Sequence, residues 1–537
     1  MINERTLFMK KAALHNLGCK VNAYELDAMQ QQLEAAGYEI VPFAPGADLY
    51  LINTCTVTNI ADRKSRQMLH RAKKMNPDAL VIAAGCYAQV KGADLQKDDV
   101  IDIVLGNDRK SDLIRVLQDF EARRAAAADP ADRNRADEST SADRIGADES
   151  TSADRIGVDA IPSADRNGAD TNTSVDRTWE AESGGGILSW TDISKVKEYE
   201  ELKISHVDTH TRAFIKVQDG CNQFCSYCII PFARGRVRSR KPEDVLAEVR
   251  DLAHAGCREV VLSGIHLSSY GVDFQKGRSA DVSAENLSEE PASAAENLSE
   301  EPSSAAEVTN LLELIRLVSR VEGIERIRLG SLEPGIITEE FAAALASIQK
   351  VCPHFHLSLQ SGCDRTLKRM NRRYTAAEYR EKCRILRKYF EDPALTTDVI
   401  TGFPGETEED FLASRDFVEE IHFFETHVFP YSRRAGTRAA SFPDQLTEQV
   451  KKERSRVLLE LDATRRREYL EKFLHKKIEI LVEETMEIDG RDFWVGYTKE
   501  YQRAAIPRTG EEDLQNQLVW LETEEILEGN VLFGNIL

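Results

Sequence analysis

Three cysteines stand close together in the stretch "DGCNQFCSYCIIP". Cys221, Cys225 and Cys228 have the spacing C-x3-C-x2-C, so one short loop can carry three thiolates. Iron–sulfur clusters are held by cysteine thiolates, usually four. A loop that supplies three would leave one iron with an open position, and a substrate or cofactor could bind there.

A zinc site is the alternative for these cysteines. Structural zinc takes four ligands, and His206 and His210 lie upstream of the loop. The context favours iron, because the loop directly follows an expected strand, "AFIKVQ", and active sites of barrels lie at the carboxyl ends of strands. Four other cysteines show no ligand spacing, and we assign them to packing: Cys257, Cys352, Cys363 and Cys383.

A second set of three cysteines is spread along the first hundred residues. Cys19 lies in "NLGCKVN", Cys55 in "INTCTVT" and Cys86 in "AAGCYAQ", and each follows an expected strand. Because the carboxyl ends of parallel strands meet at one edge of a sheet, the three thiols can converge there. Three unrelated core cysteines are the alternative, since free cysteine is often buried. Convergence favours a second three-thiolate site with an open iron.

The elements expected around these cysteines alternate between strands and helices, which is typical of an α/β fold with parallel sheets. For the N-terminal part we predict strands at 11–17, 48–53, 79–84 and 100–105 and helices at 23–36, 62–75 and 110–123. A second series of strands is expected at 213–218, 258–263, 324–331, 354–359, 395–401 and 425–430. Six successive βα units predict a (β/α)6 partial barrel.

The C-terminal part has a different pattern. A long basic helix is expected at about 447–475. The stretch "IEILVEETMEIDGRDFWVGYT" then predicts short strands with turns, typical of a small β-barrel that binds RNA.

Length and composition indicate an intracellular protein of several domains. The chain has 537 residues and ten cysteines, which favours metal or redox chemistry over a disulfide framework. We find no signal peptide and no apolar run long enough for a membrane span, and we expect a cytoplasmic protein with no membrane partner.

Two acidic segments dominate the net charge of −21. Residues 125–186 repeat "ADESTSADRIG" and residues 279–307 repeat "AENLSEEP", and each segment has a net charge of −8. Few large apolar residues occur there, so we expect disordered linkers or insertions. The rest of the chain is near −5, and net charge therefore does not exclude an RNA partner.

The C-x3-C-x2-C loop, with Tyr227 before the third cysteine, resembles the radical S-adenosylmethionine (SAM) superfamily. The resemblance implies that the amino and carboxylate groups of SAM bind the open iron, and that one-electron reduction cleaves SAM to a 5′-deoxyadenosyl radical. Polar or glycine positions at later strand ends become candidate SAM contacts: Tyr227, Gly264, Ser331, Glu333, Gln360, Gly402, Pro404 and Gly405. The last three lie in "TTDVITGFPGET", which resembles the loop that cradles adenine and could equally be an ordinary βα turn.

The order of parts resembles the methylthiotransferases, which join an N-terminal α/β domain with three cysteines, a radical SAM barrel and an RNA-binding TRAM domain. The resemblance covers about 400 residues and excludes the acidic segments. It implies two 4Fe–4S clusters, one on each cysteine set, and two SAM molecules per turnover. The expected parts are the α/β domain at 10–124, a disordered linker at 125–204, the barrel at 205–445 with a disordered insert at 275–307, a connecting helix at 446–474 and a TRAM-like barrel at 475–537.

The motifs "LGCKVNAYELDAM", "TCTVTNIADRKSRQ" and "AAGCYAQ" resemble the bacterial branch of this family that acts on N6-threonylcarbamoyladenosine-37 in tRNA. The implied reaction is methylthiolation at C2 of the adenine ring. It would need an electron donor such as flavodoxin or ferredoxin, and a sulfur source. A methylthiotransferase acting on a ribosomal-protein aspartate and a non-catalytic iron–sulfur RNA-binding protein are the alternatives. We name no catalytic residue beyond the cluster ligands.

Arginines cluster just beyond three of the expected barrel strands. An anticodon loop offers phosphates and a base that can be splayed out, and arginine suits phosphate geometry. Solvated helix faces are the alternative for each cluster. Seven arginines are the candidate RNA contacts: Arg234, Arg236, Arg238, Arg372, Arg373, Arg433 and Arg434.

Overall fold

The computed structural model describes residues 9–128, 178–179, 186–207, 211–274, 304, 308–510 and 512–537. Both copies of each acidic repeat lie outside the described residues, and so does most of the expected linker and insert. Among the helices of the described ranges, none combines the length and the hydropathy needed to cross a membrane.

The N-terminal domain contains one sheet with strand order β2-β1-β3-β4-β5-β7-β6, in which only β6 runs antiparallel to its neighbour. Its strands are β1 (Lys11–Asn16), β2 (Glu39–Val41), β3 (Leu49–Thr54), β4 (Leu80–Gly85), β5 (Ile103–Leu105), β6 (Thr178–Trp179) and β7 (Ile187–Ser189). Its helices are α1 (Lys20–Ala35), α2 (Asn59–Met75), α3 (Cys86–Leu95) and α4 (Leu113–Ala128), with a 3-10 turn η1 (Lys110–Asp112) before α4. The predicted parallel α/β domain is confirmed.

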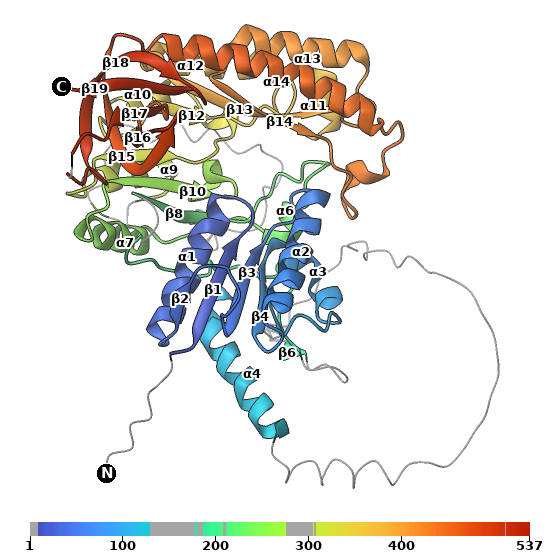
Figure 1. The fold of residues 1–537 in the computed structure, drawn as a ribbon. Coiled ribbons are helices and arrows are strands. Elements are labelled where there is room, and N and C mark those ends of the chain that lie inside the picture. Colours follow the sequence, from blue (N-terminus) through green and yellow to red (C-terminus); the bar gives the residue numbers. More distant parts are fainter. Residues whose placement is uncertain are drawn as a thin grey trace.

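Helices cover both faces of this sheet, which explains why its central strands are apolar throughout. In β3, Leu51 packs with residues of α1 and α4 in one core, and the next residue, Ile52, packs with residues of α2 and α3 in the other. In Figure 1 the sheet lies beneath the central domain, and α4 extends away from the rest of the molecule.

The linker expected at 125–204 is partly wrong. Residues 187–189 form β7, which pairs in parallel with β5 and adds to the sheet. Beyond it, Leu202 and Ile204 are buried in the core of the central domain. The segment before the barrel therefore belongs to the folded structure.

The central domain contains six parallel strands in the order of the chain: β8 (Arg212–Asp219), β10 (Glu259–Gly264), β11 (Arg326–Leu329), β12 (His354–His356), β13 (Ala394–Thr401) and β14 (Glu425–Pro430). Single parallel bridges, one of them between Ile327 and Val351, connect β11 to the segment around β12. A short strand β9 (Arg238–Ser239) pairs with β8 in the antiparallel sense. The predicted partial barrel is confirmed.

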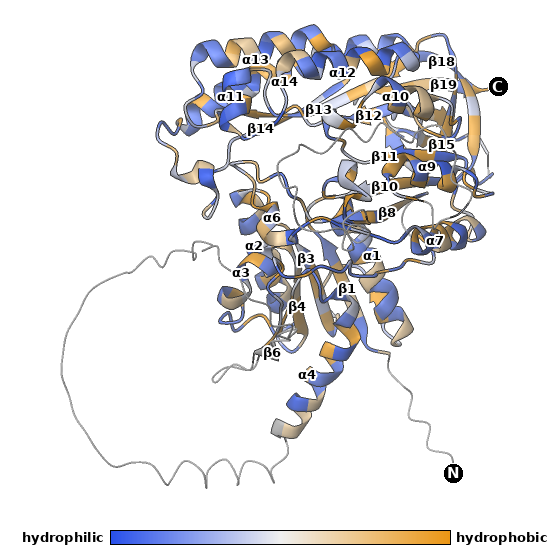
Figure 2. Ribbon diagram, turned by 180° about the vertical axis from the view of Figure 1, so that it is seen from behind, coloured by the Kyte–Doolittle hydropathy of each residue, from blue (hydrophilic) through white to orange (hydrophobic). Residues whose placement is uncertain are grey.

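Helices follow the barrel strands and pack on one of their faces. They are α6 (Ile230–Arg234), α7 (Pro242–His254), α9 (Leu311–Ser319), α10 (Glu339–Ala346), α11 (Asp364–Arg369), α12 (Ala376–Tyr389) and α13 (Glu408–Ile421), with 3-10 turns η2 (Leu267–Ser269), η4 (Pro334–Ile336) and η5 (Arg438–Ser441). Thr375 and Thr407 begin α12 and α13 with capping boxes, which satisfy backbone N–H groups of the first turn. Figure 2 shows hydrophobic residues concentrated in strands such as β4 and β8, whereas the outer helices are mixed.

Helix α14 (Glu448–Glu471) packs along β14 and α13 and leads to the C-terminal domain. That domain is a closed barrel with strand order β15-β16-β17-β19-β18. Its strands are β15 (Lys477–Ile488), β16 (Arg491–Tyr497), β17 (Arg503–Pro507), β18 (Leu518–Leu527) and β19 (Val531–Ile536). Alternate residues of β15, namely Ile478, Ile480 and Val482, form its core. The predicted small β-barrel is confirmed.

Candidate functional site

The three N-terminal cysteines lie at one edge of the N-terminal sheet. Cys19 precedes α1 just after β1, Cys55 follows β3, and Cys86 begins α3 directly after β4. In the order β2-β1-β3-β4-β5, the chain continues from β1 to β2 on one side and then adds β3 on the other side of β1. Ligands of open α/β sheets bind at such a switch point. The topology therefore brings together the three cysteines that the sequence predicted to converge.

Tight backbone around these cysteines keeps them close. A Cβ on Gly18 would lie 3.3 Å from Sγ of Cys55, and a Cβ on Gly85 would lie 2.5 Å from the carbonyl oxygen of Thr54. Burial, together with the neighbouring thiols of Cys86 and Cys19, raises the pKa of Cys55 to about 12. Thiolates gathered at one site need a compensating positive charge, which a metal centre would supply.

Cys86 is buried and receives two hydrogen bonds. Arg234, on α6 of the central domain, donates from Nε to Sγ of Cys86 over 3.1 Å, and Asn107 donates from Nδ2 over 3.7 Å. The sequence alone indicated neither partner, although α6 lies just after the second cysteine loop.

Arg234 belongs to a buried charge network centred on Glu25. The guanidinium pairs with both carboxylate oxygens of Glu25, which also bind Lys110 and Lys216, each at 2.9 Å. Burial alone would raise the pKa of Glu25, but these three cations hold it well below its usual range. Asp219 also pairs with Lys216, at 3.2 Å. Cations thus outnumber carboxylates among these side chains, which favours an anionic centre on the cysteines.

The second cysteine set lies in the loop after β8, as predicted. The N–H of Cys228 donates to the carbonyl oxygen of Cys225 over 3.0 Å, and the N–H of Cys221 donates to that of Gly235 over 3.0 Å. Burial and the neighbouring thiol of Cys225 raise the pKa of Cys228 to about 12. Gly220 begins the loop with φ +73°, and a Cβ there would lie 1.8 Å from a backbone oxygen. Only glycine allows this approach.

A charged group lies beside this loop. Arg372 donates to Sγ of Cys225 over 3.3 Å and to Glu333 over 2.9 Å, and His266 lies 3.7 Å from the same carboxylate. Burial alone would raise the pKa of Glu333, but the nearby His266 and the positive charge of Arg372 keep it below its usual value. The predicted SAM contact Glu333 is thus held close to the cysteine loop.

The other predicted SAM contacts form two groups, one near the ends of barrel strands and one at the turn after β13. Gly264 ends β10, where a Cβ would lie 2.9 Å from Oε1 of Gln218, and Gln360 has φ +69°. Tyr227 packs edge-on against Phe403, with ring centroids 6.4 Å apart. Phe403 lies within the 402–405 turn, whose residues contact other helices: a Cβ on Gly402 would meet Lys451, the carbonyl of Pro404 accepts from Arg369, and a Cβ on Gly405 would also meet Arg369. Ser331 is exposed.

The arginines predicted to contact RNA divide by burial. Arg236, Arg373 and Arg433 are exposed. The other four are buried or nearly so and pair with protein groups, which makes them wrong as phosphate contacts in this arrangement: Arg234, Arg238, Arg372 and Arg434. Arg434 binds Asp62 of α2 at 2.7 Å and so joins the two large domains. Charge runs alone could not reveal these partners, which come from distant parts of the chain.

The zinc alternative finds little support among the described residues. His206 lies 4.0 Å from Glu34, near the end of α1 opposite to Cys19, and His210 is outside the described residues. Of the cysteines assigned to packing, Cys257, Cys352 and Cys383 are buried, and Cys363 is half-buried.

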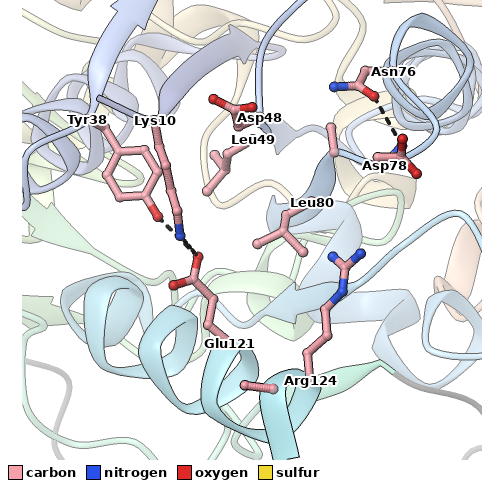
Figure 3. Close-up of a pocket in the computed structure, with 11 residues that line it drawn as sticks. Lys10, Tyr38, Asp48, Leu49, Asn76, Asp78, Leu80, Glu121 and Arg124 are labelled. Atoms are coloured by element: carbon pink, nitrogen blue, oxygen red, sulfur yellow. Dashed lines mark hydrogen bonds and ion pairs between the residues drawn. The ribbon is translucent and has the colours of Figure 1, made fainter. Parts of the chain in front are cut away.

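The hollow drawn in Figure 3 lies away from the cysteines. It is lined by Lys10, Asp48 and Arg124, among others, and by Leu49 and Leu80, which begin β3 and β4. Cys55 and Cys86 follow the opposite ends of these strands, so this hollow is no part of the candidate site.

Each cysteine set therefore contains three thiols, and in each set a side-chain N–H group donates a hydrogen bond to one of the sulfur atoms. This donor chemistry fits an iron–sulfur cluster, whose reduction potential depends on hydrogen bonds to sulfur. The two sets are connected, because Arg234 follows the second loop and binds a cysteine of the first. The arrangement can place two clusters in one molecule.

Comparison with known proteins agrees with this geometry. The model of the Radical SAM superfamily matches residues 215–418, so the class of protein is that of the radical SAM enzymes. The model of Uncharacterized protein family UPF0004 matches residues 11–106. The threonylcarbamoyladenosine tRNA methylthiotransferase MtaB of Bacillus subtilis (strain 168) is 35% identical over 95% of this chain and 93% of that protein. The tRNA-2-methylthio-N(6)-dimethylallyladenosine synthase of Thermoanaerobacter sp. (strain X514) is 32% identical over 88% of this chain and 81% of that protein.

Among solved structures, the radical SAM methyltransferase TsrM from Kitasatospora setae aligns at 15% identity and a TM-score of 0.46, over 80% of this chain and 77% of that chain. The chain belongs to the radical SAM methylthiotransferase family. It is an enzyme that transfers methylthio groups, and its cofactors are SAM and two 4Fe–4S clusters.

Proposed function

We propose that this chain inserts a methylthio group at C2 of N6-threonylcarbamoyladenosine-37 in tRNA. The observation that carries the proposal is the hydrogen bond from Arg234 to Cys86, which links two three-thiol sites within one chain. A methylthiotransferase needs one site for SAM and a second for the sulfur that is transferred. The curated relative of Bacillus subtilis supports the choice of nucleoside.

In this proposal each cysteine set has one cluster. Cys221, Cys225 and Cys228 hold the cluster that binds SAM, and the N-terminal set, Cys19, Cys55 and Cys86, holds the auxiliary cluster. Two SAM molecules per turnover would supply the chemistry, one the methyl group for the sulfur and the other the radical that activates the substrate C–H bond.

The surrounding side chains orient and stabilise these sites. Arg372 donates to Cys225 and fixes Glu333 beside it, so that a carboxylate can accept from the amino group of SAM. Gly264, which Gln218 approaches closely, stays a candidate contact for the amino group of SAM. The buried excess of positive charge around Arg234 stabilises thiolates on the auxiliary side.

The exposed arginines form the proposed RNA contact. Arg236 lies 4.5 Å above the ring of Phe224, and Phe224 contacts the exposed ring of Phe232. Such a combination of cation and exposed ring suits a backbone phosphate and an unstacked base. Arg373 and Arg433 are exposed as well and are further candidate contacts, and we assign the C-terminal barrel to RNA binding as a TRAM-like domain.

The reaction also requires a one-electron donor, such as flavodoxin or ferredoxin, and a sulfur source. Because tRNA is its substrate, we place the reaction in the cytoplasm.

A substrate pool from cells lacking the methylthio modification tests the proposal. The reconstituted enzyme is incubated anaerobically with the pool, SAM and a reductant, with and without RNase pretreatment. We expect a methylthio nucleoside that disappears after RNase. Product that survives RNase and is lost after protease would favour the ribosomal-protein alternative. Intact clusters without SAM cleavage would favour the non-catalytic one.

A further inference from the structure

Lys20 immediately follows Cys19 at the start of α1 and is only partly buried. Its ammonium lies 6.0 Å from the ring centroid of Tyr501, which belongs to the C-terminal barrel. The charges of Arg212 on β8 and Arg328 on β11 also act on it. All three domains therefore contribute side chains around this one ammonium group.

The neighbouring cations are already neutralised. Arg212 pairs with Glu483 at 2.8 Å, Arg328 pairs with Glu259 at 2.8 Å, and both guanidinium groups lie over the ring of Tyr501, at 4.9 and 4.5 Å. In contrast, Nζ of Lys20 has no hydrogen bond or ion pair within the described residues. This ammonium thus has no acidic partner among the described residues, and its partial withdrawal from water makes an unpaired charge costly.

The wall near Lys20 is polar. Four polar residues of β12, β13 and β14 lie on one face according to the strand register: His354, His356, Asp398 and His427. The opposite face, which includes Phe355, packs against the helices. His356 lies 3.2 Å from Asp398, and its ring stacks on that of His427 at 5.6 Å. These polar side chains therefore face the inside of the open barrel.

We propose that Lys20 binds the carboxylate of the threonylcarbamoyl group, and so selects an acidic N6 substituent over an apolar one. This inference rests on the proposed function. The threonylcarbamoyl group ends in a carboxylate and a hydroxyl, whereas a dimethylallyl group is purely apolar. In adenine, C2 and C6 flank N1, and N6 is attached to C6 on that same edge. In the proposed function the Cys19 set delivers sulfur to C2, and Lys20, the next residue, would then face the group on N6.

Binding of anticodon stem-loops tests the inference without turnover. Fluorescence anisotropy under anaerobic conditions compares RNA carrying threonylcarbamoyladenosine, adenosine or dimethylallyladenosine at position 37. We expect Lys20→Gln to weaken binding of the threonylcarbamoyl RNA about tenfold and to leave the other two unchanged, because only one charge-assisted hydrogen bond is lost. Lys20→Arg should retain most of the preference, and Lys20→Glu should lose more than Lys20→Gln.

Lys74→Gln, on the exposed end of α2, is the matched control and should bind like the wild type. Iron content and visible spectra verify that each variant holds both clusters. Equal binding of threonylcarbamoyl RNA by wild type and Lys20→Gln would overturn the inference. The proposed function fails separately, if wild-type enzyme with SAM and reductant gives no methylthio product on threonylcarbamoyl tRNA.

Discussion

Arg234 donates a hydrogen bond from Nε to Sγ of Cys86 over 3.1 Å. Arg234 lies on the helix that follows the cysteine loop of the barrel, and Cys86 lies in the N-terminal domain. One buried side chain therefore connects the N-terminal cysteine set to the segment that follows the second cysteine loop. Loss of this contact should affect both stability and the auxiliary site.

Arg234→Met should destabilise the protein markedly. The change leaves Glu25 with two of its three cations and removes a buried ion pair, which costs about 3 kcal/mol. Urea unfolding of the apoprotein, followed by tryptophan fluorescence, measures the loss. Arg236→Met removes an exposed guanidinium from the same segment and should cost less than about 1 kcal/mol. Similar losses in the two variants would contradict the structural role of Arg234.

Each cysteine set should account for one cluster. Cys19→Ala and Cys225→Ala should each lower the iron content of the reconstituted enzyme from about eight to about four atoms per chain. Iron and sulfide analysis with electron paramagnetic resonance distinguishes the remaining cluster. Cys383→Ala, in the buried core, should retain both clusters. A full iron content in Cys19→Ala would refute the auxiliary site.

Exposed arginines should contribute to tRNA affinity in a salt-dependent manner. Arg373→Ala or Arg433→Ala should weaken binding at low salt and reduce the slope of log K against log salt by about 1. Arg384→Ala, on the outer helix α12, serves as the control, and its slope should be that of the wild type. An unchanged slope in both test variants would exclude this surface as the RNA contact.

His354 should make stability depend on pH. Burial, and then the charges of Arg328 and Lys20, lower the pKa of His354 well below its usual value of 6.5. The unfolded chain binds a proton below about pH 6.5 and the folded chain does not, so stability falls as the pH is lowered, by up to about 1.4 kcal/mol per pH unit.

His354→Gln should remove this contribution, whereas exposed His254→Gln should not. Urea unfolding of the apoproteins between pH 5 and pH 7.5 gives the slopes. Parallel curves for wild type and His354→Gln would show that the folded protein binds this proton as readily as the unfolded chain.

Much of the fold could be predicted because its strands are runs of apolar residues that turn-forming residues separate. The six barrel strands and the four main strands of the N-terminal sheet occur where hydrophobic runs indicated them, and parallel topology alone brought Cys19, Cys55 and Cys86 to one edge. Helix α3 was missed because it starts at Cys86 and is short, with a non-helical residue at Lys91.

The electrostatics of the site could not be predicted in the same way. "ARGRVRSRK" looks like an exposed basic run, yet Arg234 and Arg238 are buried because Glu25 and Asp219 meet them from other elements. Long-range pairing of charges leaves no periodic signal in the sequence. The same holds for Lys20, whose surroundings come from three domains.

The most direct measurement is the analysis of nucleosides after reaction. Purified tRNA that carries threonylcarbamoyladenosine and lacks the methylthio group is incubated anaerobically with reconstituted enzyme, SAM and a reductant, digested and examined by mass spectrometry. We predict 2-methylthio-N6-threonylcarbamoyladenosine with the wild type and none with Cys19→Ala or Cys225→Ala. Cleavage of SAM by the wild type without any modified nucleoside would contradict the account.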